Sequence, residues 1–260
     1  PGQGISPNKI DQLMGIRSPR NMKEGDVFFT SDLKPTSSGP RDFNFQRPFG
    51  IPVRYHDFSK LHTMSNFKFV EFHLSYKDME VDLDQFFKDR YDLEFTVHCP
   101  ELFANDHILD LCSLDESYRA RSIEEVQRVI QVTLKLKKYF KKTKPPLIII
   151  NVGGHSQNSP LPVSDRQKLY GLALESLSKL DQEGVELIPQ SMPPFPWHFG
   201  GQRFQNLFVD ATEIADFCQN NNYRVCLDIS HSKLACNHYK WSFKNFIESV
   251  SPYSAMFHIV

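Results

Sequence analysis

Histidine and acidic side chains recur at matching places along this chain, at or just after the ends of short apolar segments. They are His98, His155, Asp228, His231 and His258. Imidazole nitrogens and carboxylate oxygens are the donors that suit Zn²⁺, Mn²⁺, Co²⁺ or Mg²⁺. We expect these residues to converge on one pocket, where a divalent ion could polarise a carbonyl group or activate water.

Two further apolar segments carry polar groups in comparable positions. Glu71 and His73 lie within the run 67–74, and Gln190 ends the run 185–190. The carboxylate of Glu71 is a candidate general base, and His73 is a candidate substrate-binding group. The side chain of Gln190 could ligate a metal ion through its carbonyl oxygen, but it is neutral and cannot act as a base.

The segments that must position these residues alternate between strand-like and helix-like patterns. The predicted strands are 51–57, 67–74, 93–98, 147–152, 185–190, 223–228 and 254–260. The predicted helices are 122–140, 165–180 and 203–218, with shorter ones at 83–90 and 242–250. This alternation predicts a parallel sheet with crossover helices, whose functional groups gather at the carboxyl ends of the strands. His56 and Asp57 would end the first strand.

Seven strands in this order favour an α/β fold, a TIM (β/α) barrel that lacks its last strand-helix unit. An open, doubly wound sheet is the alternative. A complete barrel usually needs about 250 residues, and residues 51–260 are fewer. We therefore expect the chain to be truncated at its C-terminus, and the absence of an initial methionine suggests the same at its N-terminus.

Charge and composition narrow the classes of partner. The formal net charge is -1, which argues against nucleic acid as a partner because no overall field attracts it. No apolar run approaches the roughly 18 residues of a membrane span, so we expect no membrane partner. Five cysteines are scattered without a CxxC pair, which is typical of reduced thiols and a cytoplasmic location.

The segment CLDISH, from Cys226 to His231, resembles the LDxxH segment of the xylose isomerase-like superfamily, which includes endonuclease IV and sugar phosphate isomerases and epimerases. Other stretches are similar to the same superfamily, and together they span roughly residues 51–260. They are VHCPE at 97–101, NVGGH at 151–155, the Gly-rich turn and helix at 200–217, and FHIV at 257–260.

This resemblance implies a sugar or sugar phosphate as ligand and a divalent metal as cofactor. It implies that Asp228 and His258 are metal ligands, and that His231 is a ligand, a catalytic group or a substrate-binding group. Two glutamates of the isomerases bind the metal and move the proton. Gln190 stands at the first position and the second would lie beyond Val260, so Glu71 is the candidate substitute. His98 and His155 match histidines of endonuclease IV.

The loop 193–203 offers further substrate contacts. Trp197 could stack on a sugar face, while Gly200 and Gly201 could present free N–H groups to a phosphate beside Arg203. A rigid Pro-rich loop that packs over the barrel mouth explains the same residues equally well.

Residues 1–34 resemble the second half of the SAF, or antifreeze-like, domain of sialic acid synthases, in PGQGISP at 1–7, Gly15 and RNMKEGD at 20–26. Residues 35–50 are then a linker and 51–260 the barrel. The resemblance implies a fusion polypeptide with N-acylneuraminate synthase activity upstream, and a possible homodimer through the synthase and SAF parts. We expect the full-length parent to be an enzyme and residues 1–260 alone to be inactive.

Three functions follow from these observations. The preferred one is a metal-dependent sugar or sugar phosphate isomerase or epimerase module. The second is a non-catalytic, sugar-binding or regulatory barrel attached to the synthase, which the neutral Gln190 favours. The third is a phosphodiesterase of the endonuclease IV type, which the balanced charge and the incomplete ligand set disfavour.

Overall fold

The computed structural model describes residues 4–33, 40–141, 144–196 and 200–259. The chain divides into two compact units, Pro1–Phe43 and Asn44–Val260. The boundary falls inside the segment 35–50 that the composition predicts to be a linker.

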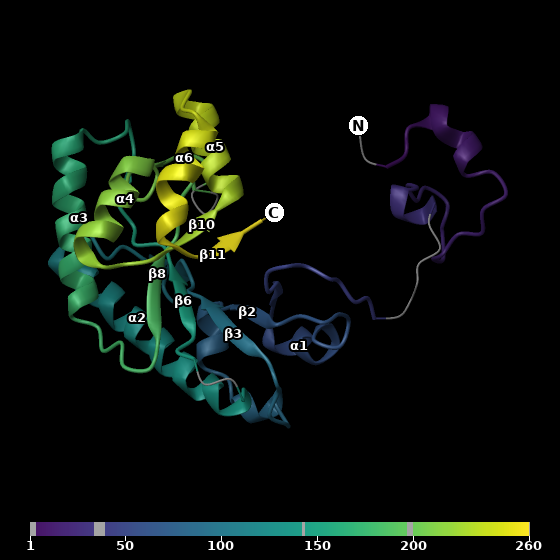
Figure 1. Cartoon of the computed structure of the whole chain (residues 1–260), viewed down its shortest axis with the longest axis horizontal. Helices are drawn as coiled ribbons and strands as arrows, with labels where there is room; N and C mark the ends of the chain where they lie inside the picture. The colour runs from purple at the N-terminus through teal and green to yellow at the C-terminus, as the bar shows by residue number, and fades with distance from the viewer. Residues whose placement is uncertain (1–3, 34–39, 142–143, 197–199, 260) are drawn as a thin grey trace. The chain divides into compact units, whose positions relative to one another are not determined.

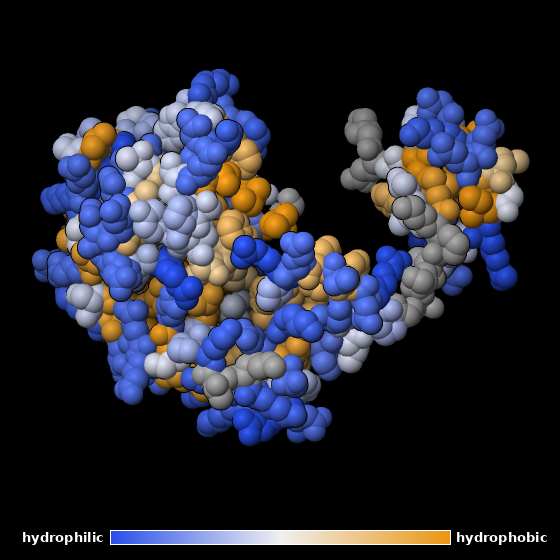
Figure 2. All heavy atoms as spheres, in the orientation of Figure 1, coloured by the Kyte–Doolittle hydropathy of each residue, from blue (hydrophilic) through white to orange (hydrophobic). Residues whose placement is uncertain are grey.

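The first unit contains two short 3-10 helices, Pro7–Gln12 and Thr30–Leu33. Arg20 ties it together, because its guanidinium donates to both carboxylate oxygens of Asp32 at 2.9 and 3.0 Å and to the carbonyl of Val27 at 2.7 Å. Among the residues described in this unit, only Asp32 is buried. Its hydrophobic side chains therefore lie at its surface (Figure 2). The SAF resemblance of this unit stays a prediction.

The second unit is built on parallel strands that pair in the order β1-β2-β3-β6-β8. A parallel bridge from Gln190 to Cys226 leads on to β10, which pairs with β11. The strands are β1 Gly50–Val53, β2 Phe69–His73, β3 Glu94–His98, β6 Leu147–Ile150, β8 Glu186–Pro189, β10 Val225–Asp228 and β11 Ser254–His258. A strand forms in each of the seven predicted segments, although the first ends at Val53, and the α/β class with a parallel sheet is confirmed.

Helices connect these strands and cover the outside of the sheet (Figure 1). They are α1 Tyr55–Leu61, α2 Glu116–Leu136, α3 Val163–Ser178, α4 Ala211–Asn221, α5 Ile229–Tyr239 and α6 Phe243–Val250. Aspartate side chains accept backbone N–H groups at the start of three of them: Asp115 before α2, Asp210 before α4 and Asp228 before α5. Such caps satisfy donors that have no partner within the helix.

Two small antiparallel pairs complete this unit: the hairpin of β4 Leu102–Phe103 with β5 His107–Ile108, and the pairing of β7 His155–Ser156 with β9 Phe204–Gln205. Within the part of the chain that the structure describes, no helix is long and apolar enough to span a membrane.

Three local predictions are wrong. His56 and Asp57 do not end the first strand but lie in α1, where the Asp57 carboxylate accepts the backbone N–H of Arg54 at 2.7 Å and so fixes the helix start. The stretch 203–218 is helical only from Ala211, because Asp210 caps the helix there and β9 precedes it. In 83–90 only a 3-10 turn forms, at Leu83–Gln85.

Alternate residues of each strand face opposite sides of the sheet. Val70, Phe72, Ile148 and Ile150 pack in the large core between the strands and the helices. A separate small cluster lies on the other face of the sheet. It consists of Ile149, Ile188 and Cys226, and Met256 packs against it. This second cluster lies on the inward face of the curved sheet.

Candidate functional site

The polar residues at the strand ends point to the same face of the sheet as the inward-facing apolar cluster. Gln190 follows Ile188 by two positions, Asp228 follows Cys226 by two, and His258 follows Met256 by two. On the neighbouring strands, Glu71 is level with Thr96 and His73 is level with His98. The inward face is therefore apolar toward the amino ends of strands β6 to β11 and polar at their carboxyl ends.

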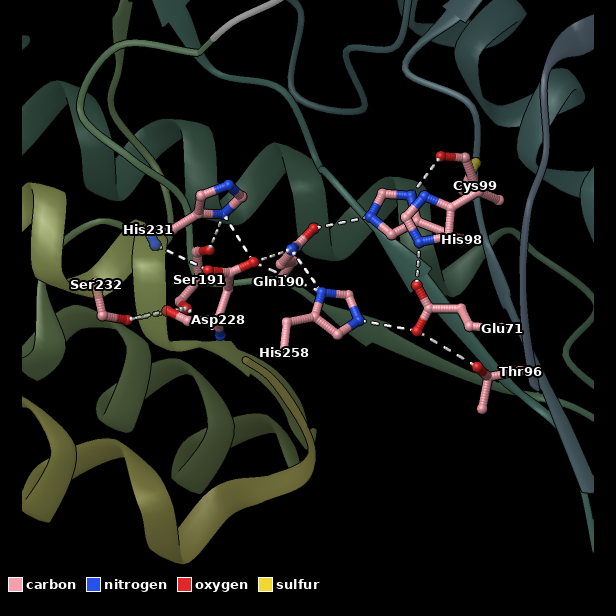
Figure 3. Close-up of polar contacts among 11 residues, drawn as sticks. Glu71, Thr96, His98, Cys99, Gln190, Ser191, Asp228, His231, Ser232 and His258 are labelled. Atoms are coloured by element: carbon pink, nitrogen blue, oxygen red, sulfur yellow. Dashed lines mark hydrogen bonds and ion pairs between the residues drawn. The ribbon is translucent and has the colours of Figure 1, made fainter. Parts of the chain in front are cut away.

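Gln190 lies at the centre of this polar layer, between His98, Asp228 and His258 (Figure 3). Its Oε1 lies 3.0 Å from His98 Nε2. Its Nε2 donates to Asp228 Oδ2 at 3.0 Å and lies 3.1 Å from His258 Nδ1. One neutral side chain thus joins strands β3, β10 and β11.

Glu71 connects the two ends of the polar layer through its two carboxylate oxygens. Oε1 lies 2.5 Å from His73 Nε2 and Oε2 lies 2.8 Å from His258 Nε2. Glu71 is only 3% exposed, and burial alone would raise its pKa. Hydrogen bonds from His258 and His73 outweigh burial and hold the pKa of Glu71 well below its ordinary value. Glu71 is therefore a buried carboxylate ion.

His258 carries the opposite charge. Burial would lower its pKa, but hydrogen bonds to Asp228, Cys226 and Glu71 outweigh burial and raise the pKa to about 12. Its Nδ1 lies 3.6 Å from Asp228 Oδ2. An imidazolium between two carboxylates compensates charges that would be costly to bury alone.

His98 is neutral, because burial lowers its pKa. Its Nε2 faces Gln190 Oε1 and its Nδ1 faces the carbonyl of Cys99 at 3.1 Å. A neutral imidazole donates from only one nitrogen and so cannot satisfy both oxygens. A half-turn of the Gln190 amide would satisfy His98 and place Oε1 beside His258 Nδ1, but it would replace the hydrogen bond to Asp228 by two facing oxygen atoms.

Asp228 ends β10 and begins α5. Its Oδ1 accepts the backbone N–H of His231 at 2.8 Å, while Oδ2 faces Gln190 and His258. The His231 ring lies over the same turn, with Nδ1 3.1 Å from the carbonyl oxygen of Ser191 and 3.5 Å from Asp228 Oδ2. Because both neighbours are acceptors, a neutral His231 carries its proton on Nδ1 and presents Nε2 as an acceptor.

Residues 59–259 match the sequence model of the family described as "Xylose isomerase-like TIM barrel". The chain belongs to this family. Comparison with curated proteins gives no match.

Solved structures of sugar epimerases share the fold. 3-Keto-D-glucoside 4-epimerase from E. coli has a TM-score of 0.54 at 11% identity, covering 81% of this chain and 78% of that one. D-allulose 3-epimerase from Methylomonas sp. has a TM-score of 0.51 at 13% identity, covering 84% and 74%. L-ribulose 3-epimerase has a TM-score of 0.51 at 15% identity, covering 80% and 69%. At these identities the likeness extends to the fold alone.

This xylose isomerase-like barrel brings together most of the residues that the sequence singles out. One network joins Glu71, His73, His98, Gln190, Asp228, His231 and His258. His155 instead lies in β7, beyond the end of β6, where it pairs with Gln205 of β9. Gly200, Gly201 and Arg203 lie in the turn before β9, and Arg203 is exposed. Trp197 lies outside the described residues.

Sequence reasoning missed three members of the site. Thr96 Oγ1 lies 3.5 Å from Glu71 Oε2, and the buried Ser191 and Ser232 contact the backbone of Asp228. Each lies within two positions of a residue that was predicted. Strand parity alone would have indicated Thr96, because it lies two residues before His98.

Proposed function

We propose that residues 44–260 form a sugar-binding module of the isomerase and epimerase type, with a divalent cation held by Gln190, Asp228 and His258. The observation that carries the proposal is the convergence of these three side chains at the carboxyl ends of β8, β10 and β11. The family and the epimerase neighbours support a sugar or sugar phosphate as ligand.

The donor atoms have roughly the spacing that a cation requires, and His258 would release its Nδ1 proton on binding one. The terminal amide atom of Gln190, Asp228 Oδ2 and His258 Nδ1 lie 3.0, 3.1 and 3.6 Å from one another. Ligands at about 2.1 Å from one ion lie about 3.0 to 3.4 Å apart. Among the described residues, no group of three or more His, Cys, Asp and Glu side chains could hold a metal. We therefore propose the Gln190 oxygen as the third ligand, after the half-turn that also satisfies His98.

A cation held there would supply polarisation of a sugar carbonyl or hydroxyl. The chain's own residues orient the ligand around it. Glu71 holds His258 through Nε2, which leaves Nδ1 facing Asp228 and Gln190. His231 Nε2 is an acceptor for a sugar hydroxyl proton. Glu71 is the carboxylate base within the cluster, although it must first release a hydrogen bond from His73 or His258.

The direct test uses the full chain with Mn²⁺, D-allulose and L-ribulose. We expect calorimetry to detect Mn²⁺ binding and sugar binding that strengthens with Mn²⁺. We expect Asp228→Asn to abolish Mn²⁺ binding, since it removes the charged ligand. Failure of the wild-type chain to bind either sugar, with or without Mn²⁺, would refute the proposal.

A binding module without turnover is the second candidate, and Gln190 favours it, because a glutamine cannot exchange a proton with carbon. The two candidates differ in one measurement. An enzyme that removes the hydrogen beside the carbonyl as a proton and returns one from solvent would introduce deuterium into the sugar in D2O. Sugar binding with neither product formation nor deuterium incorporation favours the binding module.

We further propose that residues 1–34 derive from a SAF domain and that the parent polypeptide is related to sialic acid synthases and dimerises through those parts. The support is the sequence resemblance alone. Sequencing the encoding DNA upstream of Pro1 tests it, and the absence of a synthase barrel there would contradict it.

A further inference from the structure

The turn between β10 and α5 is closed by a circuit of hydrogen bonds that runs through two serines. The backbone N–H of Asp228 donates to Ser191 Oγ at 2.9 Å. Ser191 Oγ lies 3.2 Å from Ser232 Oγ, and Ser232 Oγ donates to the carbonyl of Asp228 at 2.7 Å. Ser191 Oγ also lies 3.3 Å from the carbonyl of Asp228, so its proton can be donated to that carbonyl or to Ser232 Oγ. The circuit begins and ends on the backbone of Asp228.

This circuit is fully enclosed and joins three elements. Both serines are 0% exposed, so no water competes for their hydroxyl groups. Ser191 follows β8 and is anchored by its own N–H, which donates to the carbonyl of Cys226 in β10 at 2.9 Å. Ser232 belongs to the first turn of α5. A shift of either hydroxyl group would therefore displace the backbone at the end of β10.

The serines contact the backbone of the turn that carries the polar side chains of Asp228 and His231. With its backbone held on both sides, Asp228 points Oδ1 at the N–H of His231 and leaves Oδ2 for Gln190 and His258. The carbonyl of Ser191 lies 3.1 Å from His231 Nδ1. This carbonyl and Asp228 Oδ2, 3.5 Å away, both favour the proton on Nδ1 of a neutral His231.

We propose that Ser191 and Ser232 are positioning residues that fix the carboxylate of Asp228 and the Nδ1–H tautomer of His231. Their effect on ligand affinity rests on the function proposed above. The positioning itself is a property of the free chain and can be measured without any ligand.

A matched control separates positioning from general stability. Ser176 in α3 is also 0% exposed, and its Oγ donates to the carbonyl of Leu111 at 2.6 Å. Ser176→Ala therefore removes a buried serine hydrogen bond that has no connection with Asp228 or His231. Ser191→Ala and Ser232→Ala remove members of the circuit.

The experiment compares these three variants in the full chain. Ser232→Ala removes the hydrogen bond to the Asp228 carbonyl and leaves Ser191, the acceptor of the Asp228 amide, in place. We expect the loss of that one hydrogen bond to speed hydrogen exchange of the Asp228 amide about tenfold. We expect the ¹⁵N spectrum of the His231 ring to gain the second tautomer in both circuit variants. Mn²⁺ affinity should fall about tenfold, as with other residues that orient metal ligands.

Ser176→Ala should leave all three readouts at their wild-type values. An unchanged His231 spectrum and unchanged Asp228 exchange in the circuit variants would overturn the proposal, as would equal changes in Ser176→Ala. If Ser191→Ala does not fold, Ser232→Ala decides the matter. If the wild-type chain binds no Mn²⁺, the proposed function fails, while the His231 and Asp228 readouts still decide the role of the serines.

Discussion

His258 Nε2 and Glu71 Oε2 lie 2.8 Å apart, although the two residues are 187 positions apart in the sequence. Glu71 belongs to β2 and His258 to β11, near opposite ends of the order in which the strands pair. Two such side chains can meet only if the sheet curves round on itself. This pair therefore stabilises the barrel curvature as well as the polar site.

Removing the charge of Glu71 should destabilise the barrel. Glu71→Gln keeps the size of the side chain but leaves the His258 imidazolium without one of its carboxylate partners. We expect the free energy of unfolding at pH 6 to fall by about 3 kcal/mol, the usual effect of breaking a buried pair, measured by urea denaturation. The control Glu248→Gln breaks the exposed pair with Lys244 and should change it by less than about 0.5 kcal/mol. Equal losses would contradict this view of Glu71.

The stabilisation by this pair should depend on pH in a defined direction. The pKa of Glu71 is lowered from 4.5, so its contribution is full above pH 4.5 and is lost as pH falls. The pKa of His258 is raised from 6.5 to about 12, so its contribution is full below pH 6.5 and declines as pH rises toward 12. We expect the stability difference between wild type and a Glu71→Gln/His258→Gln double variant to peak between pH 4.5 and 6.5. Urea denaturation from pH 4 to 9 measures it, and a flat difference would contradict the charge assignment.

A carboxylate at position 190 should strengthen cation binding. Gln190→Glu replaces a neutral ligand by an anionic one beside Asp228 Oδ2 and His258 Nδ1. We expect Mn²⁺ affinity to rise about tenfold or more, which corresponds to about 1.4 kcal/mol, measured by calorimetry at constant pH. Gln131→Glu makes the same charge change at an exposed position outside the cluster and should leave the affinity within about twofold, since distant exposed charges are screened. An unchanged affinity in Gln190→Glu would remove position 190 from the ligand set.

One exposed position should accept a stabilising substitution. Lys240 ends α5 in the left-handed conformation, with φ of 63°. A side chain at such a φ costs about 1 to 2 kcal/mol that glycine avoids. We expect Lys240→Gly to raise the free energy of unfolding by about 1 kcal/mol, and Lys233→Gly, inside the same helix, to lower it by a similar amount. A loss of stability in Lys240→Gly would refute the strain argument.

The positions of the strands could be predicted from the sequence because each strand is a short apolar run that the fold covers on both faces. The inward polar residues could be predicted for a related reason, since they follow these runs at the carboxyl end, where the functional groups of a barrel gather. The predicted element boundaries are wrong at two places where an aspartate side chain fixes the start of a helix. Asp57 and Asp210 start helices through local hydrogen bonds that compete with the apolar pattern.

Which groups touch was decided only by the tertiary structure. Gln190 meets His98 across 92 positions, and Glu71 meets His258 across 187. These distances depend on the curvature of the whole sheet, and no local periodicity encodes that curvature. Likewise, Ser191 and Ser232 carry no signal of their own in the sequence. Their hydroxyl groups matter because β8, β10 and α5 enclose them together around the backbone of Asp228, where a buried polar group must find its partners inside the protein.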